Sequence, residues 1–309
     1  MARTRDIRRR IQSVRNIHKI TRTMEKVAQS KGMKLATRFE HAKEFRRRVA
    51  ALLPQALGAP LSAPEAAQEL ASHALGSVRG EPKKVLLFCV TSSRGLCGGY
   101  NARVIQAAIR RMEELRREGR EALLAVMGRK GLAYFRYHGQ PVLFPFPDVD
   151  ENIPFPRIDE IASAISDAFM KKDYDVVQVI STRWRSRAAH DVRIEGLLPF
   201  ATSRAIAAIG ESPAPPTPGP DGLPLHLVEP DRRRVRDAVL PLLVRAELFC
   251  TVLEAMLCEQ AQRSAAMRNA SDNADSMTKR LTRTYNRARQ AQITNEMIEI
   301  ISGSEEGRT

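Results

Sequence analysis

Residues 242–302 read LLVRAELFCTVLEAMLCEQAQRSAAMRNASDNADSMTKRLTRTYNRARQAQITNEMIEIIS and contain neither Gly nor Pro. At about 1.5 Å per residue, one helix of this length would run roughly 90 Å, far longer than a small domain is wide. Apolar residues recur at steps of three and four, which places one stripe on a single helix face. The stripe consists of Met267, Ala270, Ala274, Met277, Leu281, Tyr285, Ala288 and Ala291. This spacing predicts a coiled coil with a second helix, and we expect the stretch to end at Gly303.

The other end of the chain supplies the expected partner helix. Residues 3–53 lack Pro and contain one Gly, and Pro54 is expected to close the segment. Their apolar stripe consists of Ile7, Ile11, Val14, Ile17, Ile20, Met24 and Val27. Two such helices bury their stripes best by winding on each other, so the sequence predicts a long antiparallel coiled coil of the N- and C-terminal helices. We expect Ile11, Val14 and Met24 to face Met277, Leu281 and Ala288 on its seam, with other apolar residues exposed near the tips.

The middle of the chain alternates strands with helices. Strands are expected at 83–91, 121–127, 175–184 and 191–198, and helices at 102–118, 130–138 and 158–170. The run KKVLLFCVT at 83–91 is typical of a strand buried on both faces. This order predicts a small Rossmann-like α/β domain with mainly parallel strands. Residues 55–80 read as a connector with at most one short helix.

A second connector precedes the C-terminal helix. Residues 210–230 hold seven Pro and three Gly, which is typical of a linker. Pro230 and Asp231 then open the long helix, and Pro241 is a candidate position for a kink. The fold class is therefore α/β, with a coiled-coil shaft at 1–55 and 230–309, an α/β domain at 80–205 and a Pro-rich linker at 206–229.

The positive charge is concentrated at the N-terminus. The formal net charge is +15, and residues 1–50 carry sixteen Lys or Arg against four Asp or Glu, a net charge of +12. Residues 242–309 carry nine of each sign. A basic helix predicts an acidic partner, either nucleic acid, anionic lipid or an acidic protein surface. Because the charges surround the helix and flank its apolar stripe, nucleic acid and acidic protein remain equally open.

Several classes of protein are disfavoured. No run of 18 apolar residues could span a membrane, and the six His lack the spacing of metal ligands. Four Cys at 89, 97, 250 and 258 without a CxxC pattern, and no signal peptide, predict a reduced cytoplasmic compartment. The Arg-rich start resembles a transit peptide, but the apolar stripe begins at Ile7, so we assign the region to the mature fold. No catalytic set stands out, and we expect no cofactor or metal.

The turn RGLCGGY at 94–100 lies between a strand and a helix, where many α/β proteins bind phosphate. It matches neither GxGxxG nor GxxxxGK[ST], so a tight structural turn is favoured over a nucleotide site. Cys97 has no His partner in the sequence and is expected to be a small buried side chain.

Three separated stretches carry a family resemblance. They are IQSVRNIHKITRTMEKV at 11–27, SSRGLCGGYN at 92–101, and MRNASDNA at 267–274 with YNRARQAQIT at 285–294. In order and spacing they resemble the gamma subunits of F-type ATP synthases, over nearly the whole chain. One departure is LHLVEP at 225–230, where many members carry aromatic residues before the Glu-Pro pair. The Pro-rich 211–224 segment is a second departure, and no regulatory Cys pair is present.

The resemblance implies a rotor shaft without an active site of its own. In that family the coiled coil turns inside a ring of three alpha and three beta subunits, and ATP is made or hydrolysed on beta. The α/β domain sits near the epsilon subunit and the membrane ring of c subunits. The implied location is the cytoplasmic face of the bacterial inner membrane, as a peripheral protein that couples proton flow to ATP synthesis.

The resemblance also implies contact residues for the beta subunit. Met24 falls on the family's Met near an acidic lever segment of beta, and Arg22 and Lys26 are basic neighbours. Arg289 and Gln290 fall on an Arg-Gln pair that hydrogen-bonds a loop of beta. The alternative function is a basic coiled-coil nucleic-acid-binding protein, and an enzyme using the α/β domain is a weaker one.

Overall fold

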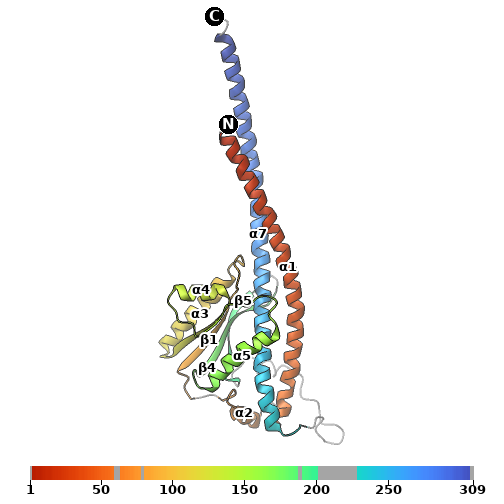
Figure 1. The fold of residues 1–309 in the computed structure, drawn as a ribbon, viewed down its shortest axis with the longest axis vertical. Helices are drawn as coiled ribbons and strands as arrows, with labels where there is room; N and C mark the ends of the chain where they lie inside the picture. Colours follow the sequence, from red (N-terminus) through yellow and green to blue (C-terminus); the bar gives the residue numbers. More distant parts are fainter. Residues whose placement is uncertain (1, 59–62, 78–79, 187–189, 201–227, 307–309) are drawn as a thin grey trace. The chain divides into compact units, whose positions relative to one another are not determined.

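The computed structural model describes residues 2–58, 63–77, 80–186, 190–200 and 228–306, and two helices dominate it (Figure 1). Helix α1 spans Ala2–Leu57 and helix α7 spans Arg232–Glu306. Thr4 on α1 hydrogen-bonds Gln292 on α7 at 3.2 Å, and Arg46 pairs with Glu247 at 2.9 Å. The residue numbers therefore rise on one helix as they fall on the other. The two long terminal helices are antiparallel, as the sequence predicts.

The central region is a five-stranded sheet in the order β3-β2-β1-β4-β5. Its strands are β1 Lys84–Val90, β2 Glu121–Met127, β3 Phe144–Phe146, β4 Val176–Trp184 and β5 His190–Leu198. Strand β1 pairs in parallel with β2 and β4, β2 pairs in parallel with β3, and β4 and β5 are antiparallel. The four predicted strands and their mainly parallel pairing are confirmed, and β3 is additional.

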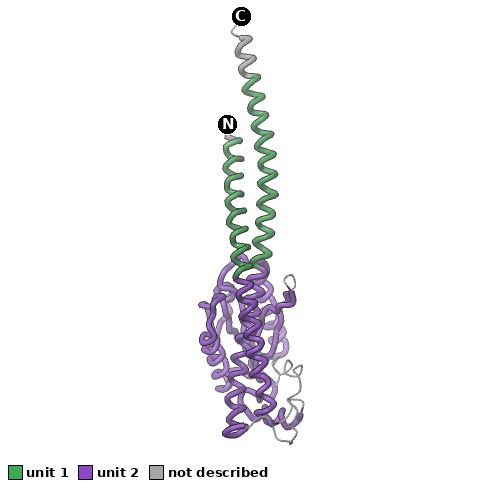
Figure 2. The backbone as a smooth tube through the Cα atoms, turned by 90° about the vertical axis from the view of Figure 1, so that its right-hand side faces the viewer, with its two compact units in different colours: residues 1–30, 263–309 green, residues 31–262 purple. Residues whose placement is uncertain are grey.

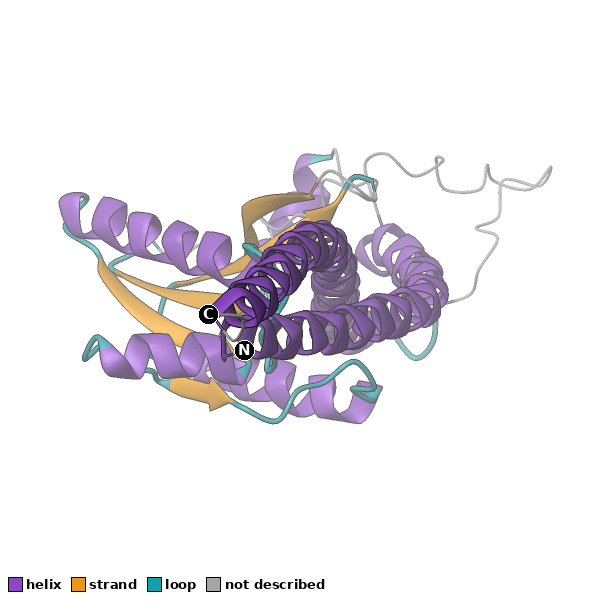
Figure 3. Cartoon of the chain, turned by 90° about the horizontal axis from the view of Figure 1, so that it is seen from above, coloured by secondary structure: helices purple, strands orange, loops and turns teal. Residues whose placement is uncertain are grey.

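Helices cover both faces of this sheet (Figure 3). Helices α3 (Tyr100–Arg117) and α4 (Arg129–Tyr137) share one apolar cluster with Leu87 and Cys89 of β1. Helix α5 (Phe155–Met170), together with parts of α1 and α7, packs against Leu86 and Phe88 on the other face. The short helix α2 (Pro64–Ala71) lies in the connector after α1. Burial on both faces explains the continuous apolar run of β1.

The chain divides into two compact units (Figure 2). Unit 2 comprises residues 31–262 and holds the sheet, its covering helices and one part of each long helix. Unit 1 comprises residues 1–30 and 263–309 and is built from the remaining parts of α1 and α7. Within the described residues, no helix combines the length and apolar character that a bilayer crossing requires.

The helix ends differ from two predictions. Helix α1 continues past Pro54 to Leu57, because Leu53, Ala56 and Leu57 are buried in the core of unit 2. Helix α7 continues past Gly303 to Glu306. This helix also contains Pro241, and a kink at that position stays a prediction. Its start is as expected, since the Asp231 carboxylate accepts a hydrogen bond from the Arg234 N–H at 2.9 Å. Residues 206–227 of the predicted linker lie outside the described residues.

The seam of unit 1 departs from the predicted stripe on α1. Ile11 is buried and Val14 and Met24 are half-buried, but Ile17, Ile20 and Val27 are 50%, 59% and 48% exposed. Besides Met24, the buried or half-buried positions after Val14 are His18, Thr21, Glu25 and Ala28. The predicted stripe takes three consecutive steps of three residues, and each such step falls about 60° short of a full turn. The apolar residues after Val14 therefore lie on a second face.

On α7 the inward positions likewise include polar residues. Met277, predicted on the seam, is 54% exposed, and Ser271 and Thr278 take inward positions. Leu281 and Ala288 are half-buried as expected. Thr278 donates its hydroxyl to the Ala274 carbonyl at 2.9 Å, and Thr21 on α1 bonds the Ile17 carbonyl at 3.0 Å. A hydroxyl that is hydrogen-bonded to a carbonyl of its own helix can be buried at little cost. The hydrophobicity of the sequence therefore does not predict the burial of these residues.

Candidate functional site

The surface of unit 1 carries the chemistry that the sequence singles out. Basic side chains from the first turns of α1 point into solvent, and the exposed ones include Arg8, Arg9, Arg15, Arg22 and Lys26. Arg8, Arg15, Arg22 and Lys26 are separated by seven, seven and four residues, so they share one face of α1, and Arg9 lies about 100° round the helix from Arg8. This part of α1 therefore presents positive potential mainly along one face.

An apolar strip accompanies these charges. Ile17, Ile20, Met24 and Val27 follow one another at steps of three and four, so they share one face of α1. All except the half-buried Met24 are exposed. We call this set the α1 strip. A contiguous apolar strip on a charged helix is typical of a surface that meets a protein partner. Sequence reasoning found these residues but placed them in the seam.

Arg289 and Gln290 lie on α7, where both side chains are exposed. Their neighbours are the half-buried Ala288 and the exposed Ala291, so only small side chains flank them. Beyond them Ile293, Met297 and Ile298 are 44%, 56% and 56% exposed, which confirms the expectation of exposed apolar residues near the tip.

Arg22 and Lys26 are four residues apart and share one face of α1, whereas Met24 is two residues from each and lies on a different face. Arg289 and Gln290 lie on the other helix, α7. Arg22 and Lys26 line a groove with Asp272 and Asp275 of α7. From Asp275 to Arg289 the helix advances fourteen residues, or roughly 21 Å at 1.5 Å per residue. The predicted contact residues therefore lie in two regions, one on each helix, and do not form one site.

The groove itself is polar and was not found from the sequence. Its volume is about 460 Å³, and its lining is His18, Arg22, Glu25, Lys26, Gln29, Arg268, Ser271, Asp272 and Asp275. The hydrogen bond from Lys279, at 2.8 Å, is the main cause that lowers the pKa of Asp275, and the nearby His18 also lowers it. Opposite charges in the groove partly cancel, so it offers no concentrated charge of one sign.

The turn after β1 uses its polar groups internally. Asn101 donates its side-chain amide to the Ser92 hydroxyl at 2.7 Å and accepts from the Ser92 N–H at 2.9 Å. Tyr100 donates its hydroxyl to the Val90 carbonyl at 3.2 Å. Leu96 and Gly98 adopt positive φ values of 63° and 58°, which close the turn. These bonds give the turn a structural role between β1 and α3.

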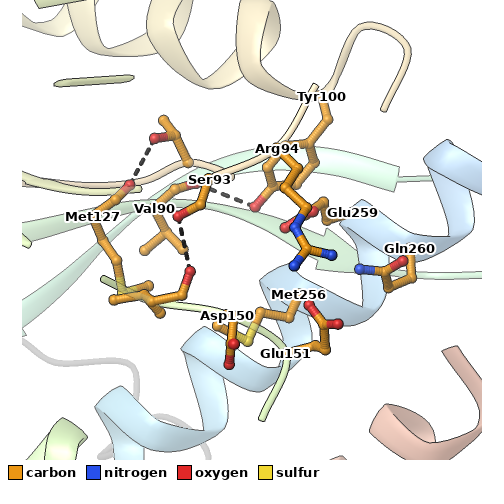
Figure 4. Close-up of a pocket in the computed structure, with 12 residues that line it drawn as sticks. Val90, Ser93, Arg94, Tyr100, Met127, Asp150, Glu151, Met256, Glu259 and Gln260 are labelled. Atoms are coloured by element: carbon orange, nitrogen blue, oxygen red, sulfur yellow. Dashed lines mark hydrogen bonds between the residues drawn. The ribbon is translucent and has the colours of Figure 1, made fainter. Parts of the chain in front are cut away.

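The cavity beside this turn measures about 30 Å³ (Figure 4). Ligand pockets usually measure about 300–1,000 Å³, so this cavity is far too small for a nucleotide. Among the described residues, no group of three or more His, Cys, Asp or Glu is placed to hold a metal ion.

The four Cys are free and buried. Cys97 is 2% exposed and packs in a small cluster with Tyr100 and Cys258, as expected of a small buried side chain. Burial raises the pKa of Cys89 and of Cys250 to about 12, and it also raises the pKa of Cys258. Protonated, inaccessible thiols are poor nucleophiles and poor metal ligands.

Comparisons with known proteins agree over the length of the chain. A family model described as ATP synthase matches residues 3–306. The ATP synthase gamma chain of Parafrankia sp. is 32% identical, over 97% of this chain and 96% of the relative. That of Acidithiobacillus ferrooxidans is 34% identical, over 98% and 99% of the two chains.

Solved structures show the same fold. A chain of the Tetrahymena thermophila mitochondrial ATP synthase, from a structure of its central stalk and c ring, matches with a TM-score of 0.56 and 24% identity. The match covers 82% of this chain and 99% of that one. A chain of the Euglena gracilis mitochondrial ATP synthase matches with a TM-score of 0.64 and 18% identity, over 97% and 93%.

Proposed function

The chain belongs to the family of ATP synthase gamma chains, and we propose that it is the central rotor shaft of an F-type ATP synthase. It couples proton flow through a membrane c ring to ATP synthesis or hydrolysis on beta subunits, by turning inside a ring of alpha and beta subunits. The observation that carries this proposal is the family match over residues 3–306. The nucleic-acid alternative receives no support from the comparisons.

The proposed division of labour follows the chain. Residues 1–55 and 230–309 form the shaft, residues 80–205 form the α/β domain, and residues 206–229 link them. The shaft transmits rotation, and the α/β domain carries the contacts to the epsilon subunit and the c ring. The protein would thus be peripheral, on the cytoplasmic face of the bacterial inner membrane.

The chain acts without an active site of its own in this proposal. Catalysis belongs to the beta subunits, and the role of this chain is to present a different face to each of them. The 30 Å³ cavity and the internally bonded turn after β1 support this division, because neither offers space for a nucleotide. No cofactor or metal enters the proposed mechanism.

Two surfaces of unit 1 are the proposed contacts with beta. The first is α1, where the α1 strip at Met24 would meet an apolar element of beta, and Arg22 and Lys26, on a different side of the helix, would meet an acidic one. The second is the pair Arg289 and Gln290. An Arg fork and a Gln amide make directed hydrogen bonds to backbone or side-chain groups, and flanking Ala residues let a partner approach closely.

Reconstitution tests the proposal directly. The chain is combined with alpha and beta subunits, and complex formation and ATP turnover are measured. A stable complex in which the chain rotates on ATP hydrolysis is the expected result. Failure to join the ring, together with strongly salt-dependent DNA binding, would favour the nucleic-acid alternative.

Charge neutralisation tests the first surface. Changing Arg8, Arg9, Arg15, Arg22 and Lys26 together to Gln should weaken assembly or torque, more at low salt than at high salt. The reason is that attraction between exposed charges is screened over about 10 Å at 0.1 M salt. Single changes should matter little, since an exposed pair is worth about 0–1 kcal/mol. A matched control neutralises the exposed Arg110, Arg116 and Arg117 on α3. Equal behaviour of both variants at low salt would contradict an acidic partner for α1.

A further inference from the structure

The loop between β3 and α5, at residues 147–153, is fastened to the turn after β1. Ser93 in that turn donates its hydroxyl towards the carbonyls of Pro147 at 3.2 Å and Val149 at 2.9 Å. Figure 4 labels Ser93 and the loop residues Asp150 and Glu151. Val149 and Ile153 are 7% and 3% exposed and belong to the main apolar core of unit 2. The loop is thus a fixed part of the α/β domain.

The same loop forms hydrogen bonds and an ion pair with α1. Arg38 donates from its two terminal nitrogens to two loop carbonyls, that of Glu151 at 2.8 Å and that of Ile153 at 2.6 Å. Lys31 forms an ion pair with the Glu151 carboxylate. Lys31 and Arg38 are seven residues apart, so they lie on the same face of the helix, two turns from each other. Two donors from one planar guanidinium fix the orientation of the helix as well as its distance.

Helix α7 is held at the corresponding level. Arg103 of α3 donates to the Gln262 side chain, which is 8% exposed. Met256, Glu259 and Gln260 of α7 also line the small cavity that Glu151 of the loop and Arg94 of the turn enclose (Figure 4). The α/β domain therefore makes polar contacts with both long helices at this level, in addition to the apolar core that it shares with them.

The two helices are close to each other there as well. A Cβ atom built on Gly32 of α1 would lie 3.8 Å from the Cβ atom of Gln260 on α7. Lys31 is the first residue of unit 2 on α1, and Gln262 is its last residue on α7. These contacts thus mark the positions in the chain where each helix passes from unit 2 to unit 1.

We propose that Arg38 is a positioning residue which, with Lys31 and Glu151, locks α1 to the α/β domain against twist, so that torque passes between the domain and the shaft. We call these three residues and the Arg103–Gln262 pair the collar. The inference rests on the proposed rotor function. It assigns the transfer of torque to identified side chains at one level of the helices.

The physical argument is that apolar packing resists separation more than rotation. Burial of apolar surface is non-directional, so small rotations of a helix that keep its apolar face buried are resisted less by burial than by directed bonds. Directed hydrogen bonds from a rigid fork lose their geometry when the helix turns. Burial alone would raise the pKa of Glu151, but the hydrogen bond and charge of Lys31 lower it, which keeps the carboxylate ionised. The collar thus adds directional contacts for α1, while α7 also has directed contacts with the domain at Arg245–Asp159 and Trp184–Glu254.

The test compares R38K with R48K in the complete enzyme. Arg48 lies on the same helix, with its side chain 76% exposed and paired with Glu44. A Lys at position 38 keeps the charge but cannot reach two carbonyls in one plane. In sealed vesicles, the expected result is fewer protons pumped per ATP hydrolysed for R38K, and a broader spread of shaft angles at each pause. R48K should match the unaltered enzyme in both measurements.

A second measurement uses the isolated chain. Amide hydrogen exchange at Asn152 and Ile153 should be at least about tenfold faster in R38K, since a charged hydrogen bond contributes about that factor. K31Q provides a second variant with the same expected direction. If exchange in the loop is unchanged in both variants, or if exchange rises while pumping per ATP stays normal, the collar is wrong and the rotor function stands. If the unaltered chain neither joins the ring nor pumps, the proposed function fails, and the collar with it.

Discussion

The two units of this chain are stabilised in different ways. Unit 2 buries large aliphatic side chains completely, and Leu53 of α1 and Leu243, Leu248 and Leu253 of α7 all have no exposed surface. Unit 1 has a seam of Ile11, Thr21, Ala28, Met267, Ser271 and Ala274, which are small or polar apart from Ile11 and Met267. Large side chains contribute about 1.5–3 kcal/mol each when fully buried, so unit 2 holds most of the stability. The seam of unit 1 instead keeps its two helices close together.

The difference extends to the surface. Unit 1 exposes Ile17, Ile20, Val27 and Met277 on the same parts of the helices whose buried residues are mostly small or polar. A folded region that buries little and exposes much is completed by a partner. Unit 2 should therefore be sensitive to substitutions in the isolated chain, and unit 1 should be sensitive mainly in the assembled enzyme.

The largest expected effect lies in unit 2, at the buried pair of Arg46 and Glu247. Their side chains are 15% and 4% exposed and lie 2.9 Å apart. E247Q leaves the Arg46 guanidinium without its anionic partner, which should lower the free energy of unfolding by about 3–5 kcal/mol. Trp184, the one Trp of the chain, lies in β4 of unit 2, so its fluorescence reports on this unit. A loss below about 1 kcal/mol would show that the pair contributes little.

Glu254 provides a matched control with a different pH dependence. Burial is the main cause that raises the pKa of Glu254, although the hydrogen bond from the Trp184 N–H, at 3.0 Å, opposes it. Since the folded-state pKa is above the unfolded value of about 4.3, the unaltered protein loses stability as the pH rises through the raised pKa. E254Q removes that loss and should be no less stable than the unaltered protein at neutral pH. Unfolding curves at several pH values compare the two.

A smaller loss of stability is expected when one apolar side chain is truncated, and it should differ between the two units. L253A in unit 2 should lower the free energy of unfolding by about 2–5 kcal/mol, because it leaves a cavity among fully buried side chains. I17A in unit 1 removes a side chain that is 50% exposed and should change stability by less than about 0.5 kcal/mol. Urea unfolding of the isolated chain measures both. Equal losses would mean that the two units do not differ as described.

The sequence predicted the elements of unit 2 well, because their signals are local. Strand β2 has the predicted bounds Glu121–Met127, and β1 and β4 differ by one residue at their ends. Strand β3 was missed because it has three residues, Phe144–Phe146, with Pro145 in the middle. So short a segment carries no periodicity, and only pairing with β2 defines it.

The register of the seam was harder to predict. His18, Thr21, Ser271 and Thr278 occupy inward positions although none is apolar, and Ile17, Ile20 and Met277 face solvent. An apolar stripe identifies the buried face of a helix only if the apolar residues of that helix are all buried within the same chain. In unit 1 the apolar residues serve two faces, so a single stripe drawn through them crosses from one to the other.

The last prediction concerns Arg289 and Gln290, where the expected effect on stability is the smallest. Both are exposed on α7, so R289A and Q290A remove no contact from the core of either unit. The melting temperature of the isolated chain should therefore stay the same. In the assembled enzyme, a charged hydrogen bond made only in the rate-limiting rotary state contributes about 1.5–3 kcal/mol, and its loss should slow ATP turnover roughly 10- to 100-fold.

The neighbouring Arg287 supplies the control for R289A, since it is exposed on the same helix two residues from Arg289 and so points to a different side from that residue. R287A should leave turnover nearly unchanged if the contact depends on the geometry of Arg289 and not on total charge. Normal turnover in R289A and Q290A would rule out the proposed contact with beta. A marked fall in melting temperature would instead make both residues structural, and unit 1 would then resemble unit 2 in holding its stability within the chain.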